Sequence, residues 1–144
     1  MTVHGRAETV ITAFATYHQP HPALHSLKII SDGHYTSPPA ATTRDFVLLF
    51  PHVQNLILNG HIHFLILRAL KTFEPLWPEL SMITIIPVDA ADRKQMWDDI
   101  FQVVWNRLKI GHPVSRIKIP SRILTRFTHR QQESLRSKVL LEEC

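Results

Sequence analysis

The stretch WPELSMITIIP, residues 77–87, contains a spacing of apolar residues on which the interpretation of the whole chain depends. Leu80 is followed three positions later by Ile83 and two positions after that by Ile85. The same three-then-two spacing occurs three more times, at Leu24, Leu27 and Ile29, at Val53, Leu56 and Leu58, and at Val114, Ile117 and Ile119. The copies begin 29, 27 and 34 residues apart. Each copy is short and rich in Leu, Ile and Val, which predicts a β-strand.

Segments with helical periodicity lie between these strand cores. The clearest covers 92–110, where one face collects Met96, Ile100, Val103, Val104 and the pair Arg107/Leu108, and where Trp97, Phe101 and Trp105 widen the apolar surface. We expect Asp89 or Asp92 to cap the start of this helix and Gly111 to end it with a positive φ.

Shorter elements are predicted on either side. Thr42 and Asp45 have the spacing of a helix-start signal and predict a helix over 43–50. Another helix is predicted over 7–17. A last helix is expected to begin at Ser121 and to run into the 130s, and the tail KVLLEE, residues 138–143, is expected to form a final strand.

Asn59 and Gly60 lie between two apolar runs and allow two structures over 59–73. In the first, Asn-Gly is the turn of a hairpin that pairs 54–58 with 61–67. In the second, the strand ends at Gly60 and a helix follows through Phe64, Leu67 and Leu70. The repeat favours the helix, because each strand core elsewhere is followed by a helical segment. The hairpin remains the alternative.

The resulting order alternates helices and strands, which predicts parallel strands joined by right-handed helical crossovers. A helix–strand unit that recurs every 27 to 34 residues is typical of a solenoid. We therefore predict an α/β solenoid with about four parallel strands in sequential order and helices on the outer side. The alternative is an ordinary small α/β sheet with irregular strand order.

Two phrases resemble a known family. EPLWPELSMITI and VVWNRLKIGHPVSRIKIP are similar to the leucine-rich-repeat-like regions of F-box proteins common in mushroom-forming (basidiomycete) fungi. There a Leu-Trp-Pro-x-Leu phrase opens a strand and an Arg-x-x-x-Gly-x-Pro phrase, here Arg107, Gly111 and Pro113, follows a helix. The resemblance covers the chain from about Leu24. It implies a single leucine-rich-repeat-like domain over 1–144, with an N-terminal helical segment at 1–20 and repeat cores near 24–30, 53–59, 80–86 and 114–120.

In that family an F-box docks on an adaptor of a ubiquitin ligase, and the repeats hold the substrate. This chain has no recognisable F-box, so the resemblance implies a non-catalytic scaffold for protein–protein interaction rather than the ligase connection. Whether the gene product carries an upstream F-box, which protein it binds and in which oligomeric state it exists are left open by the sequence.

Composition narrows the remaining classes. Apolar residues make up 44% of the chain and charged residues 19%, which indicates a globular protein rather than a disordered one. Cys144 is the only cysteine, so no internal disulfide can form, and we expect a cytoplasmic or nuclear protein. No apolar run approaches the length that a membrane span requires, and no membrane association is expected.

No catalytic, cofactor or metal motif is recognisable. The chain has ten histidines, but the pair His61 and His63 has no nearby acidic or cysteine ligand to complete a zinc site. The acidic residues Asp89, Asp92, Asp98 and Asp99 lack the glycine turn and the final Glu of a calcium loop. We expect no enzyme activity, no cofactor and no metal.

The basic residues are concentrated near the end of the chain. The segment from Arg107 to Lys138 contains nine Lys or Arg residues and a single acid, Glu133. Arg122, Arg126 and Arg130 recur every four residues and would line one face of a helix. The alternative function is therefore binding of nucleic acid or of an acidic partner through the basic quarter 107–138.

The repeat also predicts where a partner protein would bind. If the apolar positions of each strand point to the core, the residues between and after them point the other way. This outward set comprises Ser26, Lys28, Ile30, Asn55, Ile57, Asn59, Met82, Thr84, Ile86, Arg116, Lys118 and Pro120. We predict partner binding by Lys28, Ile57, Met82, Thr84, Ile86, Arg116 and Lys118, because apolar residues inside a polar rim are typical of a protein interface.

Overall fold

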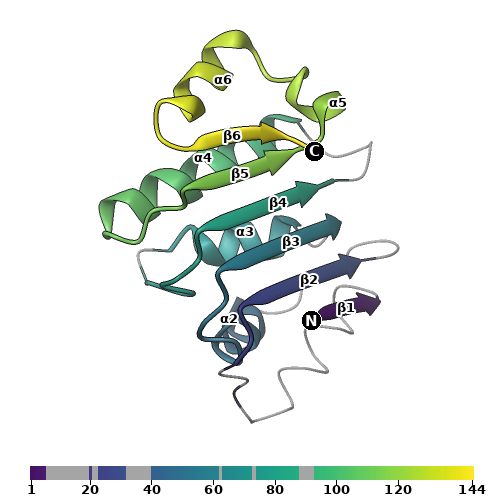
Figure 1. The fold of residues 1–144 in the computed structure, drawn as a ribbon, viewed down its shortest axis with the longest axis vertical. Helices are drawn as coiled ribbons and strands as arrows, with labels where there is room; N and C mark the ends of the chain where they lie inside the picture. Colours follow the sequence, from purple (N-terminus) through teal and green to yellow (C-terminus); the bar gives the residue numbers. More distant parts are fainter. Residues whose placement is uncertain (6–19, 21–22, 32–39, 62, 73, 88–92) are drawn as a thin grey trace.

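A computed structural model of the chain describes residues 1–5, 20, 23–31, 40–61, 63–72, 74–87 and 93–144. These residues contain one parallel six-stranded sheet whose strands follow one another in chain order (Figure 1). The strands are β1 (Thr2–Gly5), β2 (Ser26–Ser31), β3 (Asn55–Gly60), β4 (Met82–Ile86), β5 (Arg116–Ile119) and β6 (Leu140–Glu143). The predicted α/β class and the sequential order of the strands are confirmed, and the irregular strand order is wrong.

The described helices pack behind this sheet, and none of them covers its other face. The described helices are α2 (Ala40–Leu48), α3 (His63–Leu70), α4 (Arg93–Lys109), α5 (Ser121–Leu124) and α6 (His129–Arg136). In Figure 1, α2, α3 and α4 lie behind the strands, and α5 and α6 lie near β6. The main core fills the space between the sheet and these helices.

The register of the sheet explains why the apolar spacing recurs. Leu27 pairs with Leu56, Leu56 with Ile83, and Ile83 with Ile117. The repeats therefore stack equivalent residues in one row, and each row points toward the helices. Eleven of the twelve predicted core positions are buried, while the twelfth, Leu24, packs partly buried against the core.

The sheet has six strands rather than about four. The final strand expected in the tail is present as β6, whereas β1 was not predicted. β1 lies in the segment 1–20 that was expected to be helical, and it lacks the three-then-two spacing. It joins the sheet by pairing with β2, from Thr2 opposite Lys28 to Gly5 opposite Ser31. The helix predicted over 7–17 lies outside the described residues.

The ambiguous segment after β3 forms a helix. β3 pairs in parallel with both β2 and β4, and α3 begins at His63, so the hairpin is wrong. Gly60 ends the strand with a φ of 89°. A β-carbon at this position would lie 2.1 Å from the carbonyl oxygen of Ser31, so the two backbones approach as closely as only glycine permits.

Two helix boundaries differ from the prediction. α2 begins at Ala40, so Thr42 and Asp45 lie inside the helix and do not form its start. The single helix predicted from Ser121 is divided into α5 and α6. The division occurs because Thr128 and Gln131 form a capping box, in which the Thr128 hydroxyl accepts the Gln131 N–H at 3.2 Å and the Gln131 side chain accepts the Thr128 N–H at 2.8 Å.

The two described glycines with positive φ give a matched test of this architecture. Gly60→Ala should reduce the free energy of unfolding by about 3 kcal/mol or more, because it combines an unfavourable φ with a clash against backbone. Gly111→Ala should cost only about 1 kcal/mol, since its φ is 80° but no atom lies within 4 Å of the added carbon. Urea denaturation of both variants checks this, and equal losses would contradict the close approach at Gly60.

Candidate functional site

The face of the sheet that is turned away from the described helices carries the residues predicted to bind a partner. Lys28, Ile57, Thr84 and Lys118 are paired in succession from β2 to β5 and form one row across the strands. Met82 and Arg116 belong to the neighbouring row, and Ile86 lies opposite Asn59 in a third row. The structure thus brings the seven predicted residues onto one face, which we call the sheet face.

The middle of the sheet face is apolar and accessible. Ile57, Met82 and Ile86 are half-buried, although none of them points to the core behind the sheet. Thr84 is the exception among the predicted residues, because it is buried between its neighbours and offers little contact area. No described helix covers this face, which is turned toward the viewer in Figure 1.

The basic side of the sheet face is partly neutralised by a residue that the prediction did not include. Glu142 of β6 is opposite Lys118 in the register. Its carboxylate lies 3.5 Å from the Lys118 ammonium and 3.7 Å from Nε of Arg116. Applying the outward alternation to the expected last strand would have found Glu142. As a result, Arg116 and Lys118 form a mixed-charge rim with this acid.

The strands begin on a repeated backbone ladder. The carbonyl of His25 accepts the N–H groups of Gln54 and Asn55, at 2.9 and 3.0 Å. The carbonyl of Gln54 does the same for Ser81 and Met82, and the Ser81 carbonyl does so for Ser115 and Arg116. The same two-donor contact recurs at the start of β3, β4 and β5. It fixes the strands that carry the sheet face relative to one another.

Side chains reinforce these contacts at the beginnings of the strands. The Ser115 hydroxyl donates to the Ser81 carbonyl at 3.0 Å, and the Ser81 hydroxyl donates to the Gln54 carbonyl at 3.2 Å. Glu79 accepts a hydrogen bond from Gln54 at 3.1 Å and lies 2.6 Å from a ring nitrogen of His52. These two contacts hold the pKa of the Glu79 carboxyl below its usual value.

Arg107 joins the two phrases that carried the family resemblance. Its side chain is buried and donates hydrogen bonds to the carbonyls of Leu76 and Trp77, at 2.8 and 2.9 Å. Trp77 is buried and has a φ of 50°, an uncommon conformation for a bulky residue. Burial lowers the pKa of Arg107 to about 10, so the guanidinium stays charged at neutral pH.

Gly111 completes this arrangement at the end of α4. The N–H of His112 donates to the Arg107 carbonyl at 3.0 Å and that of Gly111 to the Leu108 carbonyl at 3.3 Å, which is a Schellman cap. The predicted positive φ of Gly111 is confirmed. Arg107 was predicted, as part of the pair Arg107/Leu108, to lie on the apolar face of this helix, and its buried side chain reaches from that face to the segment before β4.

The two histidines of the HIH segment have different environments. His61 is half-buried in the turn after β3, whereas His63 is fully buried as the first residue of α3. The His63 Nδ1 lies 2.7 Å from the Gly60 carbonyl and donates a proton to it. Burial lowers the pKa of His63, although the contact with Gly60 and the charge of Asp99 oppose the shift.

The acidic residues of α4 do not form a carboxylate pair. Asp98 is half-buried, while Asp99 is buried, forms an ion pair with Lys71 and accepts a hydrogen bond from Gln95 at 2.8 Å. Asp89 and Asp92, the expected caps of this helix, lie outside the described residues. Within the described part of the chain, no three His, Cys, Asp or Glu side chains gather as a metal site would require.

The predicted arginine stripe does not exist as a helix face. Arg122 lies on α5, Arg126 in the turn after it and Arg130 on α6, because the helix is broken before Thr128. Arg122 and Arg126 also interact within the structure already. The periodicity of four residues therefore has no counterpart in three dimensions.

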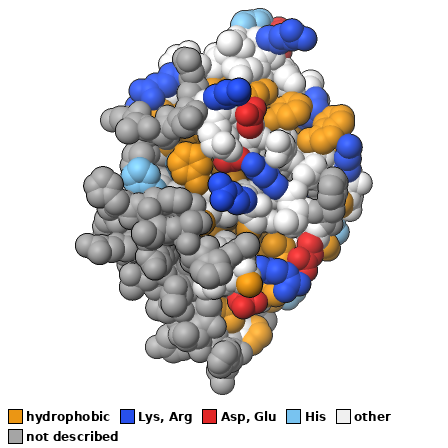
Figure 2. Space-filling view, turned by 180° about the vertical axis from the view of Figure 1, so that it is seen from behind, with side chains coloured by type: hydrophobic (Ala, Val, Ile, Leu, Met, Phe, Trp, Pro, Cys, Tyr) orange, Lys and Arg blue, Asp and Glu red, His pale blue; other side chains and the backbone are white. Residues whose placement is uncertain are grey.

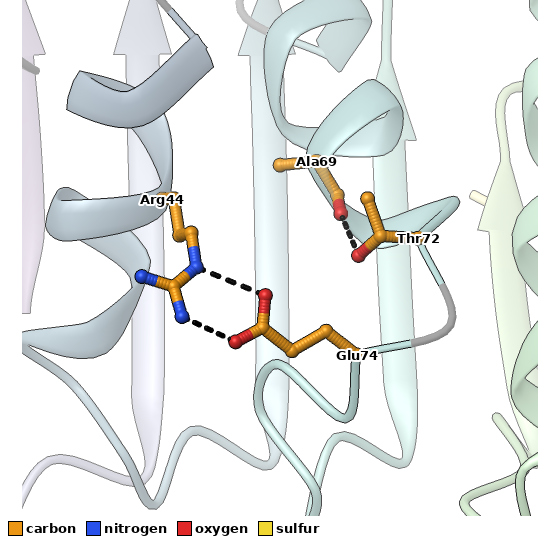
Figure 3. Close-up of polar contacts among 4 residues, drawn as sticks. All are labelled: Arg44, Ala69, Thr72 and Glu74. Atoms are coloured by element: carbon orange, nitrogen blue, oxygen red, sulfur yellow. Dashed lines mark hydrogen bonds and ion pairs between the residues drawn. The ribbon is translucent and has the colours of Figure 1, made fainter.

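Surface contacts fasten α2 to the segment after α3. Arg44 and Glu74 form a two-pronged ion pair, with Nε donating to one carboxylate oxygen at 2.9 Å and Nη2 to the other (Figure 3). The pair lowers the pKa of Glu74, and it is exposed on both sides. The Thr72 hydroxyl donates to the Ala69 carbonyl at 3.0 Å nearby. These contacts position helices and do not form a binding site.

Comparisons with protein-family models, with curated proteins and with solved structures found no match to this chain. Among the helices that the structure describes, none has the length and apolarity to cross a membrane.

The contact of Arg107 with two carbonyls generates a stability prediction. Arg107→Met should lower the free energy of unfolding by about 3 kcal/mol, because two buried carbonyls would lose their donors. Arg107→Lys should restore little, since one ammonium does not reproduce the fork that spans both oxygens. Denaturant titration with the exposed Arg136→Met as control checks this, and a loss no larger than the control would contradict it.

The burial of His63 generates a pH prediction. Because its folded pKa lies below the unfolded value of 6.5, its contribution is complete above that pH and is lost as the pH falls through it. The unfolding free energy of the parent should therefore decline as the pH falls below 6.5. The decline should be smaller in His63→Asn. Parallel curves for the parent and this variant would contradict the prediction.

Proposed function

We propose that this chain is a non-catalytic scaffold that binds a partner protein through the sheet face. The observation that carries the proposal is the position of Ile57, Met82 and Ile86, which are half-exposed on adjacent strands of a face that no described helix covers. Apolar side chains clustered within a polar rim are typical of protein interfaces.

Rigidity supports the proposal. The backbone ladder at the start of β3, β4 and β5 fixes these strands relative to one another. A preformed surface binds with a smaller loss of conformational entropy than a flexible one. The residues that contact a partner thus need no rearrangement before binding.

The charges on the rim indicate the kind of partner surface that fits. Lys28 lies on the β2 side of the apolar centre, while Arg116, Lys118 and Glu142 form the mixed-charge rim on the β5 and β6 side. A complementary partner would place apolar residues at the centre and an acid toward Lys28. The charges would mainly fix orientation and the rate of association.

The proposal extends to the resemblance noted in the sequence. The repeated two-donor ladder and the stacked rows are what a leucine-rich-repeat-like solenoid would contain. We propose on this basis that the chain corresponds to the substrate-recognition repeats of F-box proteins, and that its partner would be a protein delivered to a ubiquitin ligase. A cytoplasmic or nuclear location belongs to the same proposal.

The test compares the parent with a variant changed only on the sheet face. Ile57→Thr combined with Met82→Arg should reduce recovery of a partner from cell extract by about tenfold, because central apolar contacts dominate binding energy. Both changes keep residues that suit a strand exposed on one side. The recovered protein should then bind the purified parent directly, with the same loss in the variant.

The matched control is Leu48→Thr, which also replaces an exposed apolar residue but lies on α2, behind the sheet. It should bind as the parent does. Thermal unfolding of all three proteins shows whether the fold is kept. The proposal would be contradicted if the parent and the sheet-face variant, both folded, recovered the same proteins in equal amounts.

A further inference from the structure

One side of α4, next to its buried face, carries a ladder of aromatic rings. Trp97, Phe101 and Trp105 follow one another at four-residue spacing, with ring centroids 5.3 Å apart for the first pair and 6.4 Å for the second. Trp97 also contacts the buried Phe127, at 5.7 Å. The ladder is therefore anchored to the core at Trp97 and becomes more exposed toward Trp105.

The Trp105 end of this ladder leaves apolar side chains exposed on the surface. Trp105 is 39% exposed and Leu108, one turn further along, is 46% exposed. The adjoining side of the same helix supplies the core with Met96, Ile100, Val103 and Val104. Of the pair Arg107/Leu108 that was predicted on that face, Arg107 is buried there, whereas Leu108 is exposed. Two large apolar side chains thus stand together on the surface.

Two lysines are held over the rings. The Lys109 ammonium lies 5.0 Å from the centroid of Trp105, and the Lys138 ammonium lies 5.5 Å from Trp105 and 5.7 Å from Phe101. Lys138 also donates to the Ser137 hydroxyl at 3.1 Å and to the Ser134 carbonyl at 3.4 Å. We call Phe101, Trp105, Leu108, Lys109 and Lys138 the α4 platform.

Basic side chains lie close to the α4 platform. In the upper part of Figure 2, where α4, α5 and α6 lie, exposed apolar side chains have Lys and Arg side chains near them, with a few Asp or Glu side chains between. Arg136 lies in the last turn of α6. The acid of this helix, Glu133, has a carboxylate oxygen 3.4 Å from Nδ1 of His129. A ligand for this region would therefore be anionic as well as apolar.

We propose that the α4 platform binds an acidic, amphipathic protein segment, through a site separate from the sheet face. Carboxylates of the segment would pair with Lys109 and Lys138 from outside, while its apolar side chains would cover Trp105 and Leu108. Such a segment matches both properties of the surface, and the fixed position of Lys138 reduces the entropy lost on binding.

Single-stranded nucleic acid fits this surface less well. Its bases bind proteins by stacking on aromatic faces, but the ammonium groups of Lys109 and Lys138 lie over the rings of Trp105 and Phe101. A base would first have to displace them. Leu108 contributes apolar surface but no ring, which suits an aliphatic side chain better than a base.

The tryptophans allow a direct test in the intact chain. The probe is a synthetic helical peptide with Leu on one face and Glu on the other, and its control has Gln in place of every Glu. Of the three indole N–H signals in a nitrogen-edited NMR spectrum, that of Trp105 should shift on addition of the Glu peptide. The signal of Trp77, which is 2% exposed, should not.

Variants assign the effect to the α4 platform. Lys109→Gln combined with Lys138→Gln should weaken binding of the Glu peptide by about fivefold or more. The control variant Arg68→Gln, Lys94→Gln removes the same charge elsewhere on the helices and should bind as the parent does. Added salt should weaken binding of the Glu peptide by the parent and should have less effect on its binding by the platform variant.

Several results would overturn the proposal. These are no shift of Trp105 with the Glu peptide, equal binding of the Gln peptide, or unchanged affinity in the platform variant. Binding of single-stranded RNA or of phosphatidylserine vesicles in place of the peptide would assign the surface to another class of ligand. The sheet-face variant Ile57→Thr, Met82→Arg should retain peptide binding, so failure of this proposal and failure of the scaffold proposal are distinguishable.

Discussion

The guanidinium of Arg107 links the end of α4 to the segment that leads into β4, and much of the structure depends on this contact. Its two donors meet the carbonyls of Leu76 and Trp77 while its own carbonyl accepts the N–H of His112 in the helix cap. The first contact holds Trp77 in a backbone conformation that a bulky residue rarely adopts. The second directs the chain from α4 into β5. One residue therefore fixes the approach to two adjacent strands, β4 and β5.

The parallel sheet gives the molecule two unlike surfaces. Strand alternation sends one row of side chains to the helices, where burial of apolar surface stabilises the fold, and the next row to the sheet face. On the helical side, the core covers only part of the apolar surface of α4, and Trp105 and Leu108 stay exposed. Each surface thus retains apolar area that no described residue buries, and the two areas lie on opposite layers of the molecule.

The basic charge of the last quarter of the chain is divided between these surfaces. Arg107 is buried, Arg116 and Lys118 lie beside Glu142 on the sheet face, and Lys109 and Lys138 lie over rings of α4. A count of charges along the sequence treats these residues as one cluster. In the fold they have three different surroundings, so only part of the positive charge is available to attract an anionic partner.

Local patterns in the sequence determined every strand except β1, the parallel order, most of the core and the helix after Gly60, because these features follow from periodicity and from the conformational freedom of glycine. The same alternation placed the predicted binding residues on one face. The division of the last helix was also written in the sequence, in the Thr128 to Gln131 capping box. By contrast, the burial of Thr84, the pairing of Glu142 with Arg116 and Lys118, the hydrogen bonds of Arg107 to the Leu76 and Trp77 carbonyls and the exposure of Leu108 depend on neighbours distant in the chain. Only the tertiary structure decided them, because hydrogen bonds, ion pairs and burial between remote segments leave no periodic signal in either segment alone.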